Sequence, residues 1–379
     1  MVALKDYDVI IVGAGPAGSL AARKTAEKGL KVLLIEEHKT IGLPVHCSGW
    51  LNGCPYTEKL VNEFGRDKII TKVDRWRVWT PKGEFAYEMK FNGGYFVDRV
   101  KFDQFLAQKA VQAGSQISIG TKVIDIIKED EKIIGIVVKK KGKLQKMYSD
   151  LLIGCDGSKS IPMGIAQKSG ILKYDKKKER KYYPGIQVEF LNMKDVEPGV
   201  IEIFFGSIFD KHIANAFVSN LDEEGHAMVG FGTYQDYLNV KKNHPILKKR
   251  LENAQEFGLR GGLYALLLGE ALKTGVLSGL MLCGDAVGYH GIIPAAISGV
   301  MAADIAVDAV GASSFSMETL QEYDKIRRKH PIAKAKLGMS FADLPEDALN
   351  TFLKEQGEIF NKEMFKDLEK FHYESSHKK

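Results

Sequence analysis

The feature that most constrains this chain is a glycine-rich turn between an apolar run and a helical pattern near the N-terminus. Residues 7–12 (YDVIIV) predict a buried strand. Residues 16–28 begin with proline and carry apolar side chains at helical spacing, and residues 31–36 (KVLLIE) predict a second strand. These segments predict a β-α-β unit, and the turn that opens its helix carries a Gly-x-Gly-x-x-Gly motif at Gly13, Gly15 and Gly18.

Such a unit is typical of dinucleotide-binding proteins. The first glycine permits the tight turn, the second lets the backbone approach a pyrophosphate, and the third lets the helix pack against the strand. Glu36 ends the second strand, where it would bind the adenosine ribose hydroxyls and repel a 2′-phosphate, which favours FAD or NAD over NADP. Because helix N-termini attract anions, we expect the pyrophosphate to bind at Gly13, Gly15, Pro16, Ala17 and Gly18.

Composition excludes several classes of protein. The chain has 379 residues, 45% of them hydrophobic, and no run approaches eighteen uninterrupted apolar residues, so we expect no membrane-spanning helix. The first strand begins too early for a signal peptide. The cysteines lack Cys-x-x-Cys spacing, which argues against a zinc site or a disulfide framework, and for a reducing cytoplasm: Cys47, Cys54, Cys155 and Cys283.

The net charge is +6, and much of the lysine lies in two clusters, at 139–146 and 173–181. The simpler interpretation is solvated hairpin tips and loops. The alternative is a cationic face that meets anionic lipid headgroups or an acidic partner. Nucleic acid is not an expected partner, because no recognisable binding module or aromatic interleaving accompanies the lysines.

Beyond the first unit, helical and strand-like segments alternate. Residues 42–53 predict a loop, and residues 95–113 begin extended and become an amphipathic helix. Residues 118–148 predict a small antiparallel sheet that turns at Gly142, and a buried strand is expected at 150–155.

Period-two alternation returns between residues 183 and 234 and predicts a second, mostly antiparallel sheet. Another buried strand is expected at 276–283, followed by a small-residue helix at 295–310. The last part of the chain predicts amphipathic helices with breaks at Pro331 and Pro345.

We therefore expect an α/β protein: a Rossmann-like nucleotide-binding domain, an inserted sheet domain for the substrate, and a helical C-terminus. The nucleotide-binding domain is expected to be discontinuous, over residues 1–75, 97–165 and 275–325. The substrate sheet would take 76–96 and 166–274, and the C-terminal helical region 326–379.

Several motifs together resemble flavoproteins of the p-hydroxybenzoate hydroxylase fold. They are GAGPAG at 13–18, VDRVKFDQFLA at 97–107, CDGSKS at 155–160 and GDA at 284–286. Two further segments, IGLPVHCSG at 41–49 and LPEDALNTFLKEQ at 344–356, resemble the geranylgeranyl reductase family (digeranylgeranylglycerophospholipid reductase-like). Members of that family saturate the isoprenoid chains of archaeal membrane lipids or of the chlorophyll phytyl precursor. Relatives with the same core include aromatic hydroxylases and halogenases.

The resemblance implies FAD, bound by segments from both ends of the chain. Arg99 matches an arginine that contacts the FAD phosphate or ribose region, and Asp285 an aspartate that holds the ribityl or pyrophosphate end. The alternatives are a plain surface arginine and a helix cap. A helix starting near Pro294 would direct its N-terminus at the flavin. The other cofactor positions implied are Cys47, Val123, Asp156, Gly157, Gly284, Gly291 and Ile292.

Cys47 is the main catalytic candidate. Reduction of an isolated double bond needs a hydride from flavin N5 and a proton from a nearby donor. The family places the Cys47 loop near the flavin, and a thiol there can donate the proton, with His46 as a neighbour that tunes it. A small packing residue and a Cys47–Cys54 redox pair are the alternatives; Cys155 and Cys283 are expected to be buried and inert.

The sequence departs from the family at two places. Residues 214–219 (ANAFVS) replace the usual Tyr-x-Trp-x-Phe-Pro pattern, and the alanines there would enlarge the substrate cavity or change its wall. The loop after Asp285 is short, which brings His290 close to the flavin, although an ordinary loop histidine is the simpler interpretation.

We therefore expect an FAD-dependent reductase of geranylgeranyl chains in membrane lipids or related prenyl compounds, working as a peripheral enzyme at the cytoplasmic face of the membrane. The alternatives are a monooxygenase acting on an aromatic or quinone-like substrate and a non-catalytic prenyl-binding protein. No second Gly-x-Gly-x-x-Gly motif is present, so electrons would arrive transiently from NADPH, reduced deazaflavin or a ferredoxin, the last docking on the lysine clusters.

Overall fold

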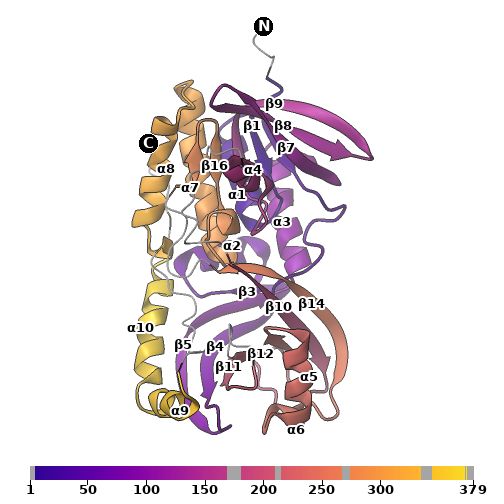
Figure 1. Cartoon of the computed structure of the whole chain (residues 1–379), viewed down its shortest axis with the longest axis vertical. Coiled ribbons are helices and arrows are strands. Elements are labelled where there is room, and N and C mark those ends of the chain that lie inside the picture. The colour runs from indigo at the N-terminus through magenta and orange to yellow at the C-terminus, as the bar shows by residue number, and fades with distance from the viewer. Residues whose placement is uncertain are drawn as a thin grey trace.

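The computed structural model describes residues 5–168, 181–209, 215–266, 274–333, 344–371 and 373. Two sheets lie one above the other in an elongated molecule, and helices line one long side (Figure 1). Each sheet has eight strands, and each is assembled from segments that lie far apart in the sequence.

The first sheet is built around β1 (Tyr7–Val12), which is buried and pairs in parallel with strands on both sides. Its parallel neighbours are β2 (Val32–Ile35) and β9 (Lys143–Gly154). The parallel part is extended by β6 (Gln116–Ser118) and β16 (Leu280–Leu282), and the antiparallel strands are β15 (Val276–Leu277), β7 (Thr121–Glu129) and β8 (Lys132–Lys140). The expected β-α-β unit is confirmed.

The second sheet is mostly antiparallel, with strand order β14-β10-β13-β12-β11-β4-β5-β3. Its C-terminal strands are β10 (Lys181–Leu191), β11 (Val200–Phe205), β12 (Asn215–Asn220), β13 (Ala227–Phe231) and β14 (Gln255–Leu266). Its N-terminal strands are β3 (Trp50–Leu51), β4 (Ile69–Trp79) and β5 (Phe85–Val97). Strands β11 and β4, the single parallel pair among the described strands of this sheet, join the two groups.

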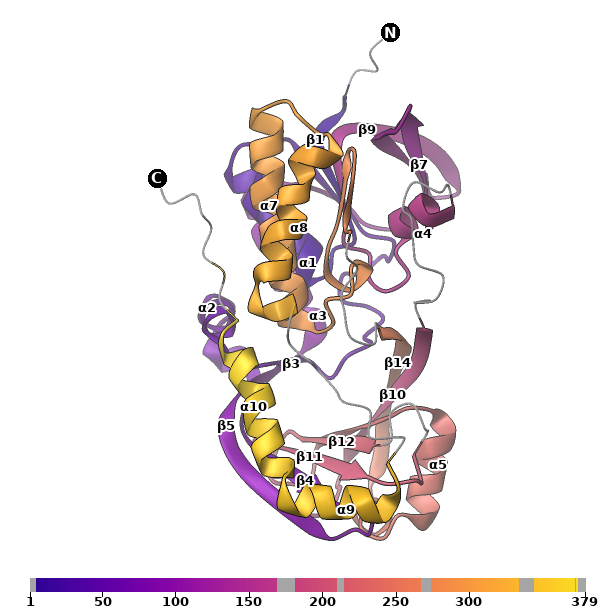
Figure 2. The same ribbon diagram turned by 60° about the vertical axis from the view of Figure 1, so that its left-hand side comes forward.

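The helices cover the faces of the two sheets. Around the first sheet lie α1 (Pro16–Glu27), α3 (Arg99–Gln112), α4 (Ile161–Lys168), α7 (Ile292–Gly311) and α8 (Met317–Lys329). Helix α2 (Pro55–Phe64) follows β3. Helices α5 (Tyr234–Asn243) and α6 (Leu247–Arg250) lie on one side of the second sheet (Figure 1), and α9 (Glu346–Glu355) and α10 (Gly357–Glu369) lie on the other (Figure 2).

Helix α7 is the one described helix that is long and apolar enough to cross a membrane, and 78% of its apolar window is buried inside the protein. It packs against α1 so closely that a Cβ atom on Gly299 would lie 2.2 Å from the carbonyl oxygen of Ala17. Such burial is typical of a core helix.

One expected element is wrong in form. The apolar segment 276–283 is not one strand but a tight hairpin, β15 and β16, which turns at Gly279 with a φ of +77°. A Cβ atom on Gly279 would lie 2.1 Å from the carbonyl oxygen of Ile133, so only glycine fits the turn. The strand expected at 150–155 is the continuation of the β8–β9 hairpin, since β9 runs unbroken from Lys143 to Gly154.

The loop expected at 42–53 contains the short strand β3 at Trp50–Leu51, and the other segments have the expected character. Between 181 and 234 the described strands pair with one another in antiparallel fashion, and the C-terminal helices break at Pro331 and Pro345. Most of the lysine cluster at 173–181 lies outside the described residues. The domain boundaries remain a prediction. The strand β4 runs across the boundary expected between residues 75 and 76.

Candidate active site

The glycine-rich turn has the geometry that its motif predicts. Gly13 has a φ of +97°, and a Cβ atom there would lie 2.5 Å from the carbonyl oxygen of Cys155. A Cβ atom on Gly18 would lie 1.9 Å from the carbonyl oxygen of Gly13, so the helix can approach the strand this closely only because residue 18 is glycine. At Gly15 nothing lies within 4 Å of the Cβ position, and no side chain caps α1, which begins at Pro16. Its N-terminal N–H groups are therefore available to an anion.

Glu36 holds this turn together. One carboxylate oxygen accepts a hydrogen bond from the backbone N–H of Ala14 (3.0 Å), and the other lies 2.7 Å from Nδ1 of His38. Glu36 also lines a cavity of about 150 Å³ that extends to Arg99 and Asp103. The binding of ribose hydroxyls by this carboxylate stays a prediction, and its place in the cavity wall is compatible with it.

Arg99 is not a plain surface arginine. It forms a two-pronged ion pair with Asp103, with Nε–Oδ1 and Nη2–Oδ2 distances of 3.1 and 2.8 Å, and it lies close enough to the sulfur of Cys47 for an electrostatic interaction. Burial alone would lower the pKa of Arg99, but the charge of Asp103 raises it. Burial raises the pKa of Asp103, although the charge of Arg99 opposes that shift. The guanidinium thus connects the cofactor cavity to the candidate proton donor.

His46 and Cys47 have different neighbours. Nδ1 of His46 lies 2.7 Å from the carbonyl oxygen of Gly261 on β14, which ties the loop to the second sheet. The sulfur of Cys47 accepts a hydrogen bond from the N–H of Gly49 at 3.5 Å. The charged group in contact with Cys47 is therefore Arg99, a residue that sequence reasoning assigned only to the cofactor.

Asp156 carries an acceptor without a partner. One carboxylate oxygen accepts the N–H of Ile161 at 2.7 Å, while Oδ1 is buried with no hydrogen-bond partner. Burial raises the pKa of Asp156 to about 6. The next residue, Gly157, has a φ of +81° and an empty Cβ position, so its backbone is open to a ligand.

The Gly-Asp-Ala motif at 284–286 lies against the glycine-rich turn that opens α1. A Cβ atom on Gly284 would lie 3.4 Å from Cβ of Ala17, so the start of α1 and the motif are in contact. Asp285 pairs with His290, with 3.2 Å between Oδ1 and Nδ1, and Nε2 of His290 is buried without a partner. Gly291, with a φ of +98°, opens α7 at Ile292 without a side-chain cap.

A buried ion pair supports this loop and was missed from the sequence. Arg327 is fully buried and pairs with Asp324 at 2.5 Å, and its Nη1 donates to the hydroxyl of Tyr289, one residue before His290. Asp324 in turn accepts the N–H of Gly275 at 3.0 Å. The pair lies at i,i+3 on α8, a spacing visible in the sequence, but nothing there indicates its burial.

The other predicted residues are placed as follows. Val123 is buried in β7, within the core of the first sheet. Cys54 caps α2 by accepting the N–H of Thr57, and burial raises its pKa. All the cysteines are free, and Cys155 and Cys283 are buried. No group of three or more His, Cys, Asp or Glu side chains among the described residues could hold a metal ion.

A second cavity, of about 190 Å³, lies between the Cys47 loop and the second sheet. Ser48 of the loop lines it together with Trp50 on β3 and Phe96 on β5. The sheet side is lined by Gly185, Ile186, Gln187, Ile201, Phe217, Ser219, Met228, Gly230 and Phe231. Its walls are mainly apolar, as a hydrocarbon ligand requires.

The expectation that the alanines of 214–219 enlarge this cavity is wrong for Ala216. Phe217 and Ser219 line the cavity, whereas Ala216 packs into the separate core beneath α5. Alternate residues of a strand point to opposite faces, so Ala216 faces away. Ala214 lies outside the described residues.

These residues fit an FAD molecule. The backbone is open at Gly15 and Gly157, α1 and α7 begin without side-chain caps, and the buried Oδ1 of Asp156 and Nε2 of His290 lack partners. Uncapped helix N-termini suit a pyrophosphate and an electron-rich flavin edge.

Comparison with known proteins agrees with this geometry. A family described as FAD dependent oxidoreductase matches residues 8–161. A digeranylgeranylglycerophospholipid reductase of Methanosarcina acetivorans is 32% identical over 346 residues, covering 85% of this chain and 81% of that protein. The protein of the same name from Thermoplasma acidophilum is 29% identical over 93% of both chains. A crystal structure of a geranylgeranyl bacteriochlorophyll reductase-like protein from Thermoplasma acidophilum has a TM-score of 0.78, with 26% identity and 92% of each chain covered.

The expected architecture and cofactor are therefore confirmed: the fold is that of the p-hydroxybenzoate hydroxylase-like flavoproteins, and the protein is an FAD-dependent oxidoreductase.

Proposed function

This chain belongs to the digeranylgeranylglycerophospholipid reductase family, and from that premise we propose that it saturates the C=C bonds of geranylgeranyl chains in membrane lipids. The observation that carries the proposal is the apolar cavity that opens beside the Cys47 loop, with Ser48 and Trp50 in its wall. A hydrocarbon chain in this cavity would have its double bond close to the thiol.

Bound FAD would supply the hydride for this reaction, held by the glycine turn, Glu36, Asp156 and the start of α7. Sγ of Cys47 would hold the proton that the second carbon of the double bond receives. When that proton leaves, Arg99 compensates the negative charge on the sulfur through the contact it already makes. Asp103 keeps the guanidinium in place through its two hydrogen bonds.

The cavity walls serve the same chemistry. An isolated alkene offers no polar group for recognition, so it is positioned by shape, and Trp50, Phe96 and Phe217 provide rigid apolar surfaces. The same side chains exclude water from the region of the thiol, which keeps its proton for the substrate.

The electron donor and the location of the enzyme extend the proposal. The donor would be NADPH, reduced deazaflavin or a ferredoxin, reaching the flavin transiently. The enzyme would work as a peripheral protein on the cytoplasmic face of the membrane, because its substrate is a lipid of that membrane.

An anaerobic experiment tests the function. The bound flavin is reduced, a geranylgeranylated lipid is added in detergent, and the return of the oxidised-flavin absorbance is followed together with the mass of the lipid. A gain of hydrogen by the lipid in step with flavin oxidation is the expected result. Flavin oxidation only after oxygen is admitted would indicate a monooxygenase, and a colourless protein that binds the lipid would indicate a non-catalytic carrier.

A further inference from the structure

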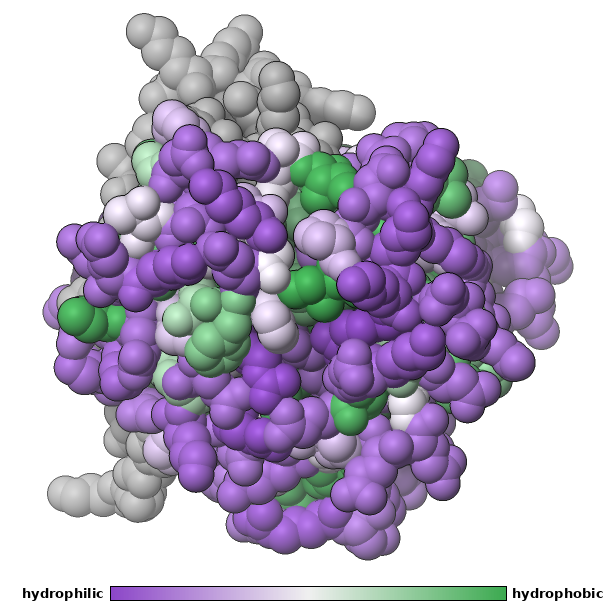
Figure 3. Space-filling model, turned by 90° about the horizontal axis from the view of Figure 1, so that it is seen from below, coloured by the Kyte–Doolittle hydropathy of each residue, from purple (hydrophilic) through white to green (hydrophobic). Residues whose placement is uncertain are grey.

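A group of large apolar side chains is exposed at one edge of the second sheet. Phe257 and Leu259 on β14 are 67% and 62% exposed, and Leu263 on the same strand is also exposed, as are Tyr234 and Leu238 on α5. These residues are called here the β14–α5 patch. Seen from below, this end of the molecule is mainly hydrophilic, with hydrophobic side chains in small separate groups (Figure 3). Exposed apolar side chains that share one strand and its neighbouring helix therefore call for a partner.

The side chain of Leu259 on β14 points to the face of the sheet that α5 covers. Leu259 pairs with Val188, whose side chain packs in the core beneath α5. Helix α5 reaches β14 directly, because Nζ of Lys241 lies 2.9 Å from Oε1 of Glu256. Residues 234 and 238 are one helical turn apart and share a face of α5. Leu259 and Leu263 thus share the face of the sheet that α5 covers, Phe257 lies at a register shift of the same strand, and β14 is the edge strand of its sheet.

Exposed lysines lie at the α5–α6 end of this surface. Lys241 is paired with Glu256, whereas the exposed Lys242, Lys248 and Lys249 form no ion pair with any described residue. They lie at the end of α5 and on α6, which packs against it. Apolar side chains that project from a rim of lysines are typical of proteins that insert into the surface of an anionic membrane.

The strand that carries the patch neighbours a strand of the cavity wall. Strand β10, the only neighbour of β14 among the described strands, supplies Gly185 and Gln187 to the cavity wall. The carbonyl oxygen of Gly261, two residues after Leu259, accepts the hydrogen bond of His46. Strand β14 thus lies one strand from the cavity wall, while Leu259 points to the opposite face of the sheet from Gln187.

We propose that the β14–α5 patch docks this enzyme on the surface of an anionic lipid bilayer, an inference that rests on the proposed function. A second copy of the chain fits less well. A symmetric contact across this edge would set the lysine rim of one copy against that of the other, and like charges repel. An anionic bilayer instead offers both an apolar layer for Phe257 and Leu259 and opposite charge for the lysines.

The test is cosedimentation of the FAD-loaded protein with phosphatidylcholine vesicles, with or without phosphatidylglycerol. One variant removes the apolar part, Phe257→Ser with Leu259→Ser, and a second reverses the charge, Lys242→Glu with Lys248→Glu and Lys249→Glu. We expect wild type to bind the anionic vesicles and each variant to bind at least about tenfold more weakly. Retained flavin absorbance shows that the variants are folded.

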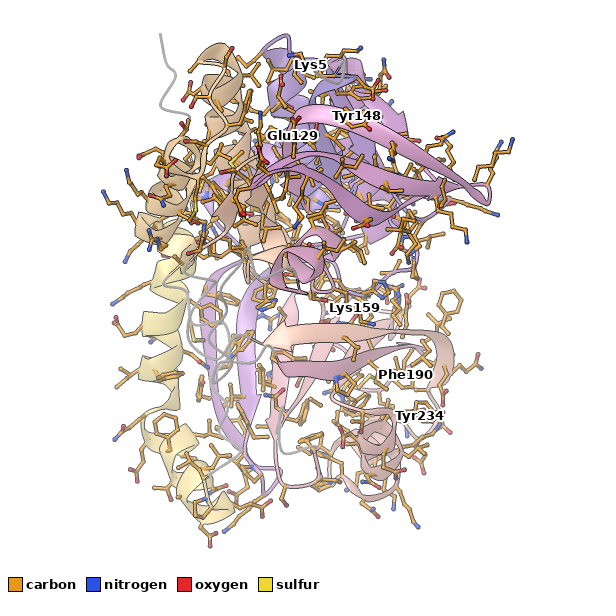
Figure 4. The ribbon with its side chains drawn as sticks, turned by 45° about the horizontal axis from the view of Figure 1, so that its top comes forward. Lys5, Glu129, Tyr148, Lys159, Phe190 and Tyr234 are labelled. Carbon is orange, nitrogen blue, oxygen red and sulfur yellow. The ribbon has the colours of Figure 1, made fainter. Side chains whose placement is uncertain are left out.

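The β8–β9 hairpin offers a matched control. Leu144 at its tip is 64% exposed and is surrounded by exposed lysines, so Leu144→Ser with Lys139→Glu, Lys141→Glu and Lys143→Glu makes the same kind of change elsewhere. Tyr148 on β9 and Tyr234 on α5 lie at opposite ends of the molecule (Figure 4). Unchanged vesicle binding of this control supports the proposal, and loss of binding only in the control overturns it.

Further outcomes separate this inference from the function. Reduction of detergent-dispersed lipid by wild type, without vesicle binding, overturns the docking surface and leaves the function standing. Patch variants that reduce detergent-dispersed lipid normally but fail on vesicle-embedded lipid support both. A wild-type dimer that the Phe257→Ser and Leu259→Ser changes convert to a monomer, with vesicle binding unaltered, would assign the patch to a second copy instead.

Discussion

Gly299 meets Ala17 at a distance that no larger residue could accept: a Cβ atom on Gly299 would lie 2.2 Å from the Ala17 carbonyl oxygen. This contact brings α7 against α1 and so joins the late Gly-Asp-Ala motif to the early glycine turn. The cofactor site therefore depends on backbone contact between two helices from opposite ends of the chain.

Substitution at this contact should destabilise the protein. Gly299→Ala is expected to lower the free energy of unfolding by about 2 kcal/mol or more, since the backbone of α1 must move. It should also weaken FAD retention on gel filtration. Gly311→Ala, at the end of the same helix where the Cβ position is empty, should be neutral or stabilising by up to about 1 kcal/mol in urea unfolding. Equal effects at both positions would contradict the close approach.

Removal of the Cys47 thiol should affect turnover and spare the cofactor. Cys47→Ala is expected to lower the rate of lipid reduction at least about 100-fold, the usual contribution of a positioned proton donor, with unchanged FAD content. Cys54→Ser is the control, because serine is a favoured helix N-cap and this residue caps α2. Full activity of Cys47→Ala would assign the proton to another group.

Arg99 should control the reactivity of Cys47. Arg99→Gln removes the cation beside the sulfur, so alkylation of Cys47 by iodoacetamide near neutral pH should slow by about two- to tenfold in protein without cofactor. Arg23→Gln breaks a comparable ion pair, with Glu63, away from this loop and should leave the rate unchanged. An unaltered alkylation rate in Arg99→Gln would restrict that arginine to cofactor binding.

The buried pair on α8 should be costly to break singly. Arg327→Met leaves Asp324 buried without its cation and is expected to cost about 3–5 kcal/mol of stability. Asp324→Asn with Arg327→Met should recover part of that loss in urea unfolding. Arg328→Met, at the exposed neighbouring position, should change stability by less than about 0.5 kcal/mol.

His244 should make the substrate sheet sensitive to acid. It is buried, and its Nδ1 accepts the N–H groups of Ile246 and Leu247 at 3.2 and 3.1 Å. Burial lowers the pKa of His244 to about 4, so between that value and its ordinary 6.5 only the unfolded chain binds the proton. Stability is therefore complete above pH ~6.5 and falls with acidification, by about 2 kcal/mol at pH ~5.

The matched variant for this effect is His244→Asn, which keeps an acceptor at the start of α6 but does not titrate. Urea unfolding at pH ~6.5 and at pH ~5 should show a smaller loss of stability on acidification in the variant than in wild type. An identical loss in both proteins would mean that other groups cause the acid sensitivity.

The sequence predicted the parts of the fold that local chemistry decides. The roles of Gly13 and Gly18, the parallel strands around them and the period-two sheet all follow from spacing. The hairpin at 276–283 could also have been predicted, because Ser278-Gly279 is a turn dipeptide within the apolar run.

The rest depended on tertiary contacts. Spacing shows that Arg99 and Asp103 share a helix face, but not that the Cys47 loop packs onto them. Likewise, alternation shows that Ala216 and Phe217 point to opposite faces, but which face carries the cavity is decided by the loop above it.

The order of strands in the second sheet has a consequence for biosynthesis. Strand β4 pairs with β5 as soon as both are made, yet its other edge must wait for β11, and α1 must wait for α7. During synthesis the early half of the protein therefore keeps an unsatisfied strand edge and an uncovered helix face, a long-range topology that folds slowly and favours aggregation or chaperone binding. The newly made enzyme can take up its flavin only after most of the chain has left the ribosome.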